Sequence, residues 1–494
     1  MQGKTIRLFA GGLLMGIVVS NVQAEALQPD PAWQQGTLPN GFQWQVLATP
    51  QRPSDRIEIR LTVNSGSLTE SAQQSGYSRF IPHLALMQTN LSAAQTSAFW
   101  QQGSDPQRAY PPAIVSYDFT QFSLSLPNNR ADLLKEAFGW LANSAGKLSI
   151  TQETVAQGLQ AQNDVPTWPT DPRDGWWRYR LKGSTLLGHD PLLALKQPVD
   201  AQQLAAFYHK WYTPDAMTLI VVGNVDSRAV SEQINKAFGE LKGKRETPAP
   251  VPTIAPLKRE AVSIMTDKVR QDRLLIMWDN PWQPIRESAA LLRYWRADLA
   301  REALFWRIQQ SLSKNNAKDI GLGFDCRVLF LRAQCGINLD SPNDKLAGNY
   351  TMVARELANV RENGLSGDEF NALVAQKNLE LQKLFATYAR SDTDILINQR
   401  LRSLQNQVVD IAPERYQRLR QDFLSGLTVE SLNQELRQLL SQDMALVLLQ
   451  PQGEPEYSIK ALREDWDKVM TPVAAPVAVE DSVRQDVSDI PPAR

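Results

Sequence analysis

Short alternations of apolar and polar residues recur along the chain and predict β-strands. The clearest covers residues 57–63, where every second residue is Ile, Leu or Val and the others are polar, as in a half-buried strand. A mostly apolar run at residues 217–223 is typical of a fully buried strand. Further strands are predicted at residues 42–48, 115–126, 261–266, 273–278 and 444–449. We expect the last of these to end the ordered part of the chain.

Apolar residues spaced three and four apart predict helices between these strands, the longest at residues 288–312. The other predicted helices cover residues 77–89, 93–101, 131–145, 152–162, 202–211, 229–241, 346–362, 367–384, 392–404, 413–424 and 429–440. Strands and helices are therefore mixed in two stretches of the chain. This pattern predicts an α+β fold with two domains, each an antiparallel-rich sheet packed with helices.

A proline-dense segment, ETPAPVPTIAP, separates the two stretches and is expected to be an extended linker. The predicted organisation is an N-terminal domain at residues 25–245, a linker at 246–258 and a C-terminal domain at 259–470. Residues 471–494 are rich in Pro, Ala, Val and Asp, and we expect them to form a disordered tail.

Residues 1–24 have the pattern of a secretory signal peptide. Lys4 and Arg7 precede an apolar run, and small residues end the segment at Ala24, after which cleavage is predicted. An uncleaved anchor is the alternative, but the apolar run is short for a bilayer span. The chain is therefore expected to be exported without a stable membrane anchor, and to be periplasmic if its source is a Gram-negative bacterium.

The overall charge argues against several classes of partner. The chain has 52 Lys and Arg residues against 53 Asp and Glu, a formal charge of −1. A nucleic-acid-binding protein or a polybasic membrane-binding protein would carry a clear basic excess. We therefore expect no nucleic-acid partner.

Cys326 and Cys335 are the two cysteines of the chain. They lie in residues 322–339, a strand-like alternation on either side of a turn near Phe330. An exported protein folds in an oxidising compartment, so a disulfide across a hairpin is predicted. Two buried free thiols are the alternative, and the spacing matches no metal knuckle.

Residues 76–89, GYSRFIPHLALMQT, match the frame of a zinc-peptidase helix but not its chemistry. In the form H-x-x-E-H, two histidines one turn apart bind the metal and the glutamate is the base. Here Arg79 stands for the first histidine, Pro82 for the glutamate and His83 for the second histidine.

Several places together resemble the insulinase/pitrilysin (M16) metallopeptidase family over about residues 35–450. They are Leu38-Pro39-Asn40-Gly41 before a strand, Gly66-Ser67 after the next one, Gly76, Phe80, His83 and Thr89, the block Phe207, Trp211-Tyr212, Pro214, Met217 and Val222-Gly223-Asn224-Val225, then Gly321 to Phe324, and Asn363-Gly364-Leu365-Ser366 with Glu369. The resemblance implies two M16-type domains and zinc as the family cofactor.

The resemblance also implies the remaining site positions. The third zinc ligand, a glutamate in the family, falls on Gln160, and a supporting glutamate falls on Glu153, a possible partner of His83. An arginine has no lone pair for a metal, a proline cannot act as a base, and a glutamine offers only a neutral oxygen. We therefore expect no bound metal and no catalytic residue.

Two further segments bear on ligand binding. In the family, the region of residues 108–126 resembles the edge strand to which a substrate peptide adds, and Pro111 and Pro112 remove two donors from such an edge. The Pro- and Trp-rich residues 164–182 could form a binding platform, but packing of an irregular loop is the commoner use of Trp.

The expected function is that of a non-catalytic binding or scaffolding protein. Its partner would be an active M16 subunit or a polypeptide ligand. The alternative is a zinc-dependent peptidase with non-standard ligands, although three histidines leave little from which to build one. No G-x-S-x-G motif, phosphate-binding loop or cysteine–histidine pairing supports an unrelated enzyme.

Overall fold

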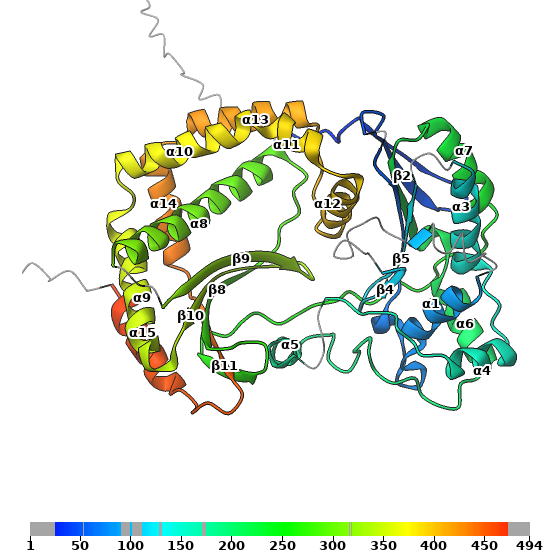
Figure 1. Cartoon of the computed structure of the whole chain (residues 1–494), viewed down its shortest axis with the longest axis horizontal. Coiled ribbons are helices and arrows are strands. Elements are labelled where there is room, and N and C mark those ends of the chain that lie inside the picture. Colours follow the sequence, from blue (N-terminus) through cyan, green and yellow to red (C-terminus); the bar gives the residue numbers. More distant parts are fainter. Residues whose placement is uncertain are drawn as a thin grey trace, which may run out of the picture.

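The structure, a computed structural model, describes residues 25–52, 54–89, 99–100, 111–127, 131–169, 174–315, 317 and 319–472. The chain forms two halves that lie side by side, each a mixed sheet with helices packed against it (Figure 1). We call the part built on β1–β6 the N-terminal half and the part built on β7–β11 the C-terminal half. The predicted α+β fold with two such domains is confirmed.

The N-terminal half contains a six-stranded sheet in the order β1-β2-β6-β3-β5-β4. Its strands are β1 (Trp33–Thr37), β2 (Gln43–Ala48), β3 (Ile57–Val63), β4 (Ala113–Val115), β5 (Thr120–Leu126) and β6 (Met217–Gly223). Strands β2 and β6 are parallel and the other pairs are antiparallel. The short helices of this part are η1 (Ser67–Thr69), η2 (Ala72–Gln74) and η4 (Pro214–Ala216).

One face of this sheet is covered by helices of the same half. The helices of this half are α1 (Tyr77–Met87), α3 (Ala131–Gly146), α4 (Gln152–Gln160), α5 (Gly175–Leu181), α6 (Ala201–Trp211) and α7 (Ser227–Phe238), of which α5 lies against the C-terminal sheet instead. Alternate β3 side chains and the apolar stripes of α1, α3, α6 and α7 meet in one core. The apolar residues that alternate along the strand thus pack against those that recur every three or four positions along the helices.

The C-terminal half repeats most of this topology. Its five-stranded sheet has the order β7-β11-β8-β10-β9, again with one parallel pair followed by antiparallel neighbours. The strands are β7 (Val262–Thr266), β8 (Asp272–Pro281), β9 (Gly321–Leu329), β10 (Arg332–Ser341) and β11 (Ala445–Pro451). This order matches β2-β6-β3-β5-β4 strand for strand.

Helices α8, α9, α14 and α15 contribute most of the C-terminal core. The helices of this half are α8 (Ser288–Lys314), η5 (Asn343–Lys345), α9 (Leu346–Asn363), α10 (Gly367–Gln382), α11 (Leu384–Arg390), α12 (Thr393–Gln405), α13 (Pro413–Gly426), α14 (Val429–Leu440) and α15 (Ile459–Met470). No helix of the described ranges is long and apolar enough to cross a membrane.

Each half covers the second face of the other half's sheet. Helix α12 lies against β3 and β6, where Leu396 and Ile397 pack on Ile220 and Val222 (Figure 1). In return, α5 brings Trp176 to the face of the C-terminal sheet. The two halves are therefore joined through buried apolar surface as well as through residues 246–258, which form no helix or strand.

Most predicted strands and helices of the described ranges are confirmed, with a few corrections. Strand β1 was not predicted, and residues 115–126 are two strands because Ser116 and Phe119 form a turn. Helix α5 lies within the Trp-rich segment, and α11 directly follows α10. The expectation that the ordered part ends at residue 449 is wrong, since α15 follows and buries Leu462 and Trp466. The signal peptide, its cleavage at Ala24, residues 93–98 and residues 473–494 lie outside the described residues.

Candidate functional site

The degenerate zinc helix is α1, and a buried glutamate fixes its start. Glu70 is 8% exposed, and its carboxylate accepts hydrogen bonds from the backbone N–H groups of Gly76 (3.2 Å) and Ser78 (2.7 Å). Gly76 has φ 87°, a conformation that favours glycine. Burial raises the pKa of Glu70 to about 7, although both hydrogen bonds act in the opposite direction. Sequence reasoning missed this residue, whose partners follow only from the fold.

Pro82 lies inside α1, because the helix begins at Tyr77. A proline at this position has no N–H to donate to the carbonyl of Ser78 and disfavours a regular helix. The helix nevertheless continues to Met87, and Phe80, Ile81 and Leu84 are buried in the core. Packing of the apolar face of α1 compensates for the lost hydrogen bond. Pro82 also leaves no side chain that could act as the general base at the position of the motif's glutamate.

Arg79 is used as a structural tether. Its Nε donates to the carbonyl of Val165 (2.7 Å), and its Nη2 donates to the carbonyl of Asn163 (2.7 Å). In return, the amide of Asn163 donates to the carbonyl of Arg79 (3.2 Å). Partial burial lowers the pKa of Arg79, and nearby Asp164 opposes this shift. The guanidinium thus binds the segment after α4 to α1.

His83 is 5% exposed and faces α4. Its Nε2 lies 3.0 Å from the carbonyl oxygen of Gly158, so this nitrogen carries the proton and donates. A protonated nitrogen has no free lone pair for a metal. The suggested pairing with Glu153 is wrong, because Glu153 is exposed in the first turn of α4 and Gly158 is the partner.

Gln160 does not lie on the face of α4 that packs against α1. The buried residues of α4 are Val155 and Gly158, whereas Gln160 is exposed at the last helical position. Residues two apart point to nearly opposite sides of a helix, so Gly158 and Gln160 cannot share a face. A Cβ at Gly158 would lie 2.5 Å from Leu84 Cδ2, which leaves no room for a ligand side chain.

The residues at these positions therefore do not fit zinc. Arg79 and His83 are held by backbone carbonyls, and Gln160 points away from them. Zinc sites in proteins need three ligands of the His, Cys or carboxylate type. Across the ranges that the structure describes, no group of three or more His, Cys, Asp or Glu side chains is arranged to hold a metal ion.

The edge of the N-terminal sheet is covered by the chain itself. The edge strand β4 begins after Pro111 and Pro112 and is three residues long. Its Val115 donates to the carbonyl of Pro166 (3.1 Å) and accepts from the N–H of Trp168 (3.0 Å), in a parallel bridge with Thr167. A peptide adding to this edge would have to displace that segment.

The tryptophans of the Trp-rich segment pack rather than form a platform. The tip of the β9–β10 hairpin, Phe330, contacts the rings of Tyr117, Trp168 and Trp177 from the N-terminal half.

The backbone at this hairpin tip is strained, because Phe330 and Leu331 both have positive φ angles, 47° and 59°. Such angles cost bulky residues about 1–2 kcal/mol each, so the ring contacts must hold the tip in place.

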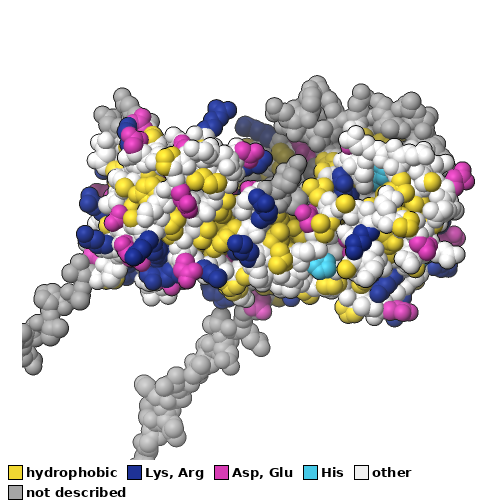
Figure 2. Space-filling model, turned by 90° about the horizontal axis from the view of Figure 1, so that it is seen from below, with side chains coloured by type: hydrophobic (Ala, Val, Ile, Leu, Met, Phe, Trp, Pro, Cys, Tyr) yellow, Lys and Arg dark blue, Asp and Glu magenta, His cyan; other side chains and the backbone are white. Residues whose placement is uncertain are grey.

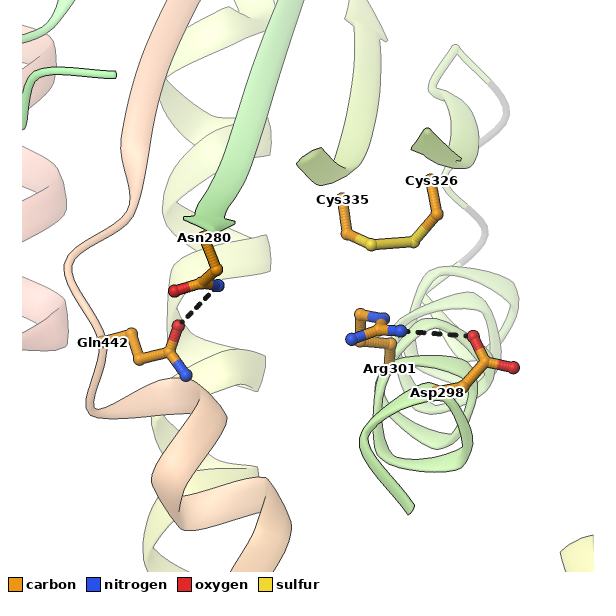
Figure 3. Close-up of a disulfide and its surroundings, with 6 residues drawn as sticks. All are labelled: Asn280, Asp298, Arg301, Cys326, Cys335 and Gln442. Carbon is orange, nitrogen blue, oxygen red and sulfur yellow. Dashed lines mark hydrogen bonds and ion pairs between the residues drawn. A yellow bond between two sulfur atoms is a disulfide. The ribbon is translucent and has the colours of Figure 1, made fainter. Parts of the chain in front are cut away.

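The same hairpin carries the two cysteines. Cys326 on β9 and Cys335 on β10 are directly opposite in the register and form a disulfide, as Figure 3 shows. Strand β9 is the edge of the C-terminal sheet, and no strand of the described ranges pairs with its outer side.

Close to this hairpin, a cavity of about 910 Å³ is lined by α8, α14 and the ends of β8, β9 and β10.

Two family profiles match the sequence. "Insulinase (Peptidase family M16)" matches residues 45–171, and "Peptidase M16 inactive domain" matches residues 198–377, together more than half of the chain. The chain belongs to the insulinase (M16) family.

The relatives of this M16 protein agree with that assignment. It is 71% identical over its whole length to Protein YhjJ of Escherichia coli strain K12, which it also covers completely. The structure of a predicted insulinase family protease from Yersinia pestis is 61% identical, with a TM-score of 0.88 over 94% of this chain and 100% of that one. The first half of the periplasmic protease PqqL from Escherichia coli shares the fold at 20% identity, with a TM-score of 0.73 over 91% of this chain and 99% of that one.

Proposed function

We propose that this M16 protein is a non-catalytic binding or scaffolding protein. The observation that carries the proposal is that two of the three zinc-ligand positions, Arg79 and His83, are used to hold the fold together. Arg79 joins α1 to the segment after α4, and His83 joins α1 to α4. The fold is therefore maintained without the metal that active members of the family require.

The proposed ligand is a polypeptide, either an extended segment or an active M16 subunit. The free side of β9 offers backbone N–H and C=O groups, and extended peptides add to such edges. Lys and Arg are interspersed with Asp and Glu on the face seen in Figure 2, with no extended field of one sign. This surface favours a protein partner over nucleic acid.

We further propose that the protein acts in the periplasm. The signal-like residues 1–24, the Cys326–Cys335 disulfide and the likeness to the periplasmic protease PqqL support this location. Fractionation of the source cells, with mass measurement of the exported chain, tests it. A mature chain that begins at Glu25 is expected, and a chain retained in the cytoplasm with Met1 would contradict it.

The absence of catalysis is tested on the exported protein as it is purified. We expect far less than one zinc per chain by elemental analysis, and no cleavage of unfolded or peptide substrates. About one zinc per chain together with chelator-sensitive cleavage would overturn the proposal. Cross-linking of the tagged chain in the periplasm should then capture a polypeptide partner, with the tag exported alone as the control.

A further inference from the structure

The cavity of about 910 Å³ is lined mainly by the C-terminal half, by residues of α8, α12, α14 and the strands β8, β9 and β10. Figure 3 shows part of its wall, with the Cys326–Cys335 disulfide, Arg301 of α8, and Asn280, whose amide donates to Gln442 (3.1 Å). Trp168 of the N-terminal half closes another side. Ligand pockets in proteins are about 300–1,000 Å³, so this cavity can hold a short peptide segment.

The charged residues of the lining are mostly basic. Four arginines, Arg293, Arg301, Arg327 and Arg402, line the cavity with a single acidic residue, Glu435. Two of these arginines pair with carboxylates beside the lining, Arg301 with Asp298 and Arg327 with Asp325 (both 3.3 Å), so the basic excess is carried by Arg293 and Arg402. Arginines held around a partly enclosed space attract carboxylates and can bind them through two parallel hydrogen bonds.

Several hydrogen-bond donors of these arginines are not used within the fold. Arg293 and Arg402 are exposed, and no side-chain partner of either is found in the part of the chain that the structure describes. Arg301 pairs with Asp298 (3.3 Å), yet its Nε is buried and has no acceptor among the described residues. A buried donor without an acceptor is costly, and a bound carboxylate would satisfy it.

The remaining lining suits a peptide chain. Trp282 and Tyr294 offer aromatic surface, and the amides of Gln405, Gln438 and Gln442 can donate to and accept from a peptide backbone. Arg293, Ala297 and Arg301 are four residues apart along α8 and therefore share one face. The small Ala297 leaves space between the two arginines.

We propose that this cavity binds a carboxylate-bearing segment of a polypeptide, an inference that rests on the proposed polypeptide-binding function and specifies its ligand. The carboxylate would come from Asp or Glu side chains or from a free C-terminus. Arg293 and Arg402 would contact it at the rim, and Arg301 would contact it inside.

The test uses three pools of octapeptides and the full exported chain. The first pool has Asp or Glu at half of its positions and blocked ends. The second replaces these residues with Asn or Gln. The third is the second pool with a free C-terminal carboxylate. Affinities are measured by titration calorimetry at low and at high salt.

The matched variants are a double change at the cavity and a single change elsewhere. Arg293→Gln combined with Arg402→Gln removes two exposed charges from the lining. The control is Arg228→Gln on α7, whose side chain is 90% exposed and pairs with Glu232. Ala297→Trp fills the space between the arginines and shows whether a peptide occupies this cavity.

Binding of the acidic pool, or of the free-C-terminus pool, should exceed that of the amide pool by about tenfold or more, and should weaken at high salt. The double variant should lose about tenfold in affinity, while Arg228→Gln should change nothing. Equal binding of all pools that is abolished by Ala297→Trp would overturn the carboxylate preference and leave the polypeptide-binding function standing. No binding of any pool would count against both.

Discussion

The two halves share one strand order but use their edges and their main helices differently. In the N-terminal half, the helix after β3 is α1, 11 residues long with Pro82 inside, and the edge strand β4 has three residues. In the C-terminal half, the helix after β8 is α8, with 27 residues, and the edge strand β9 has nine. The same topology thus has a short helix with an internal proline and a short edge strand in one half, and a long regular helix and a long edge strand in the other.

This difference shows where each half has room for a ligand. Residues 166–168 cover β4, and Arg79 and His83 are bonded to backbone carbonyls, so the N-terminal site is closed by the protein's own chain. Among the described strands none pairs with the outer side of β9, and the large cavity lies between its hairpin and α8. The positions of the family's zinc site belong to the first half, whereas the cavity that we propose for a polypeptide is lined mainly by the second.

The largest expected effect comes from weakening the packing between the two halves. Ile397→Ala on α12 removes a side chain that is 0% exposed and packs on the N-terminal sheet, so the free energy of unfolding should fall by about 3 kcal/mol. Ile395→Ala on the same helix is the control, since Ile395 is 40% exposed and should cost about 0.5 kcal/mol or less. Denaturant titration measures both. Equal losses of unfolding free energy in the two variants would mean that α12 does not pack stably on the N-terminal sheet.

A somewhat smaller effect is expected at the hairpin tip. Phe330→Ala removes a ring that contacts Tyr117, Trp168 and Trp177, and should destabilise the protein by about 2–3 kcal/mol. Leu331→Gly is the matched change at the next residue, where φ is also positive and the side chain is 38% exposed. It should be neutral or stabilising by about 1 kcal/mol, because glycine accepts this conformation. Thermal unfolding compares the two, and a larger loss for Leu331→Gly would refute the account of the tip.

The pH dependence of stability should be a property of the N-terminal half. Burial raises the pKa of Glu70 to about 7, so the folded state holds this proton more tightly than the unfolded state. The contribution of Glu70 is then fully present below its unfolded pKa and is lost as the pH rises through about 7. Between about pH 5.5 and 7.5 the loss should be about 2 kcal/mol.

Glu70→Gln should remove this slope, whatever constant effect it has on stability. Glu287→Gln is the control, because Glu287 precedes α8 in the other half, is exposed and caps nothing with its side chain. Denaturant titrations at several pH values give the slopes. A Glu70→Gln protein that keeps the wild-type slope would show that another group, such as Asp118, whose pKa burial raises to about 6, is responsible.

The smallest expected effect concerns repair of the zinc site. Arg79→His, Pro82→Glu and Gln160→Glu together recreate the residue types of H-x-x-E-H and a distant glutamate. We nevertheless expect no stoichiometric zinc, because position 160 is exposed and Gly158 occupies the face toward α1. Elemental analysis of the triple variant decides this. One tightly held zinc per chain would mean that α4 can turn to present residue 160.

Much of the fold follows from local patterns that the sequence displays directly. The alternation at residues 57–63 forms β3, and the long helical pattern after residue 288 forms α8. The types of residue at positions 79 and 82 also exclude ligation and base chemistry whatever the fold around them, because those limits belong to the side chains themselves. Helix α15 could have been predicted too, since Leu462, Trp466 and Met470 are four residues apart.

Only the tertiary structure decided which groups meet. Gly158 rather than Gln160 opposite His83, and α12 as the cover of the N-terminal sheet, depend on contacts between segments far apart in the chain. The cap that Glu70 provides for α1 is closer in sequence, but it depends on the path of the chain between η1 and α1. Secondary structure is determined largely by residues within one or two turns, so the sequence displays it. Which helix face meets which neighbour depends on how whole elements pack, and that is settled only when the sheets, helices and loops come together.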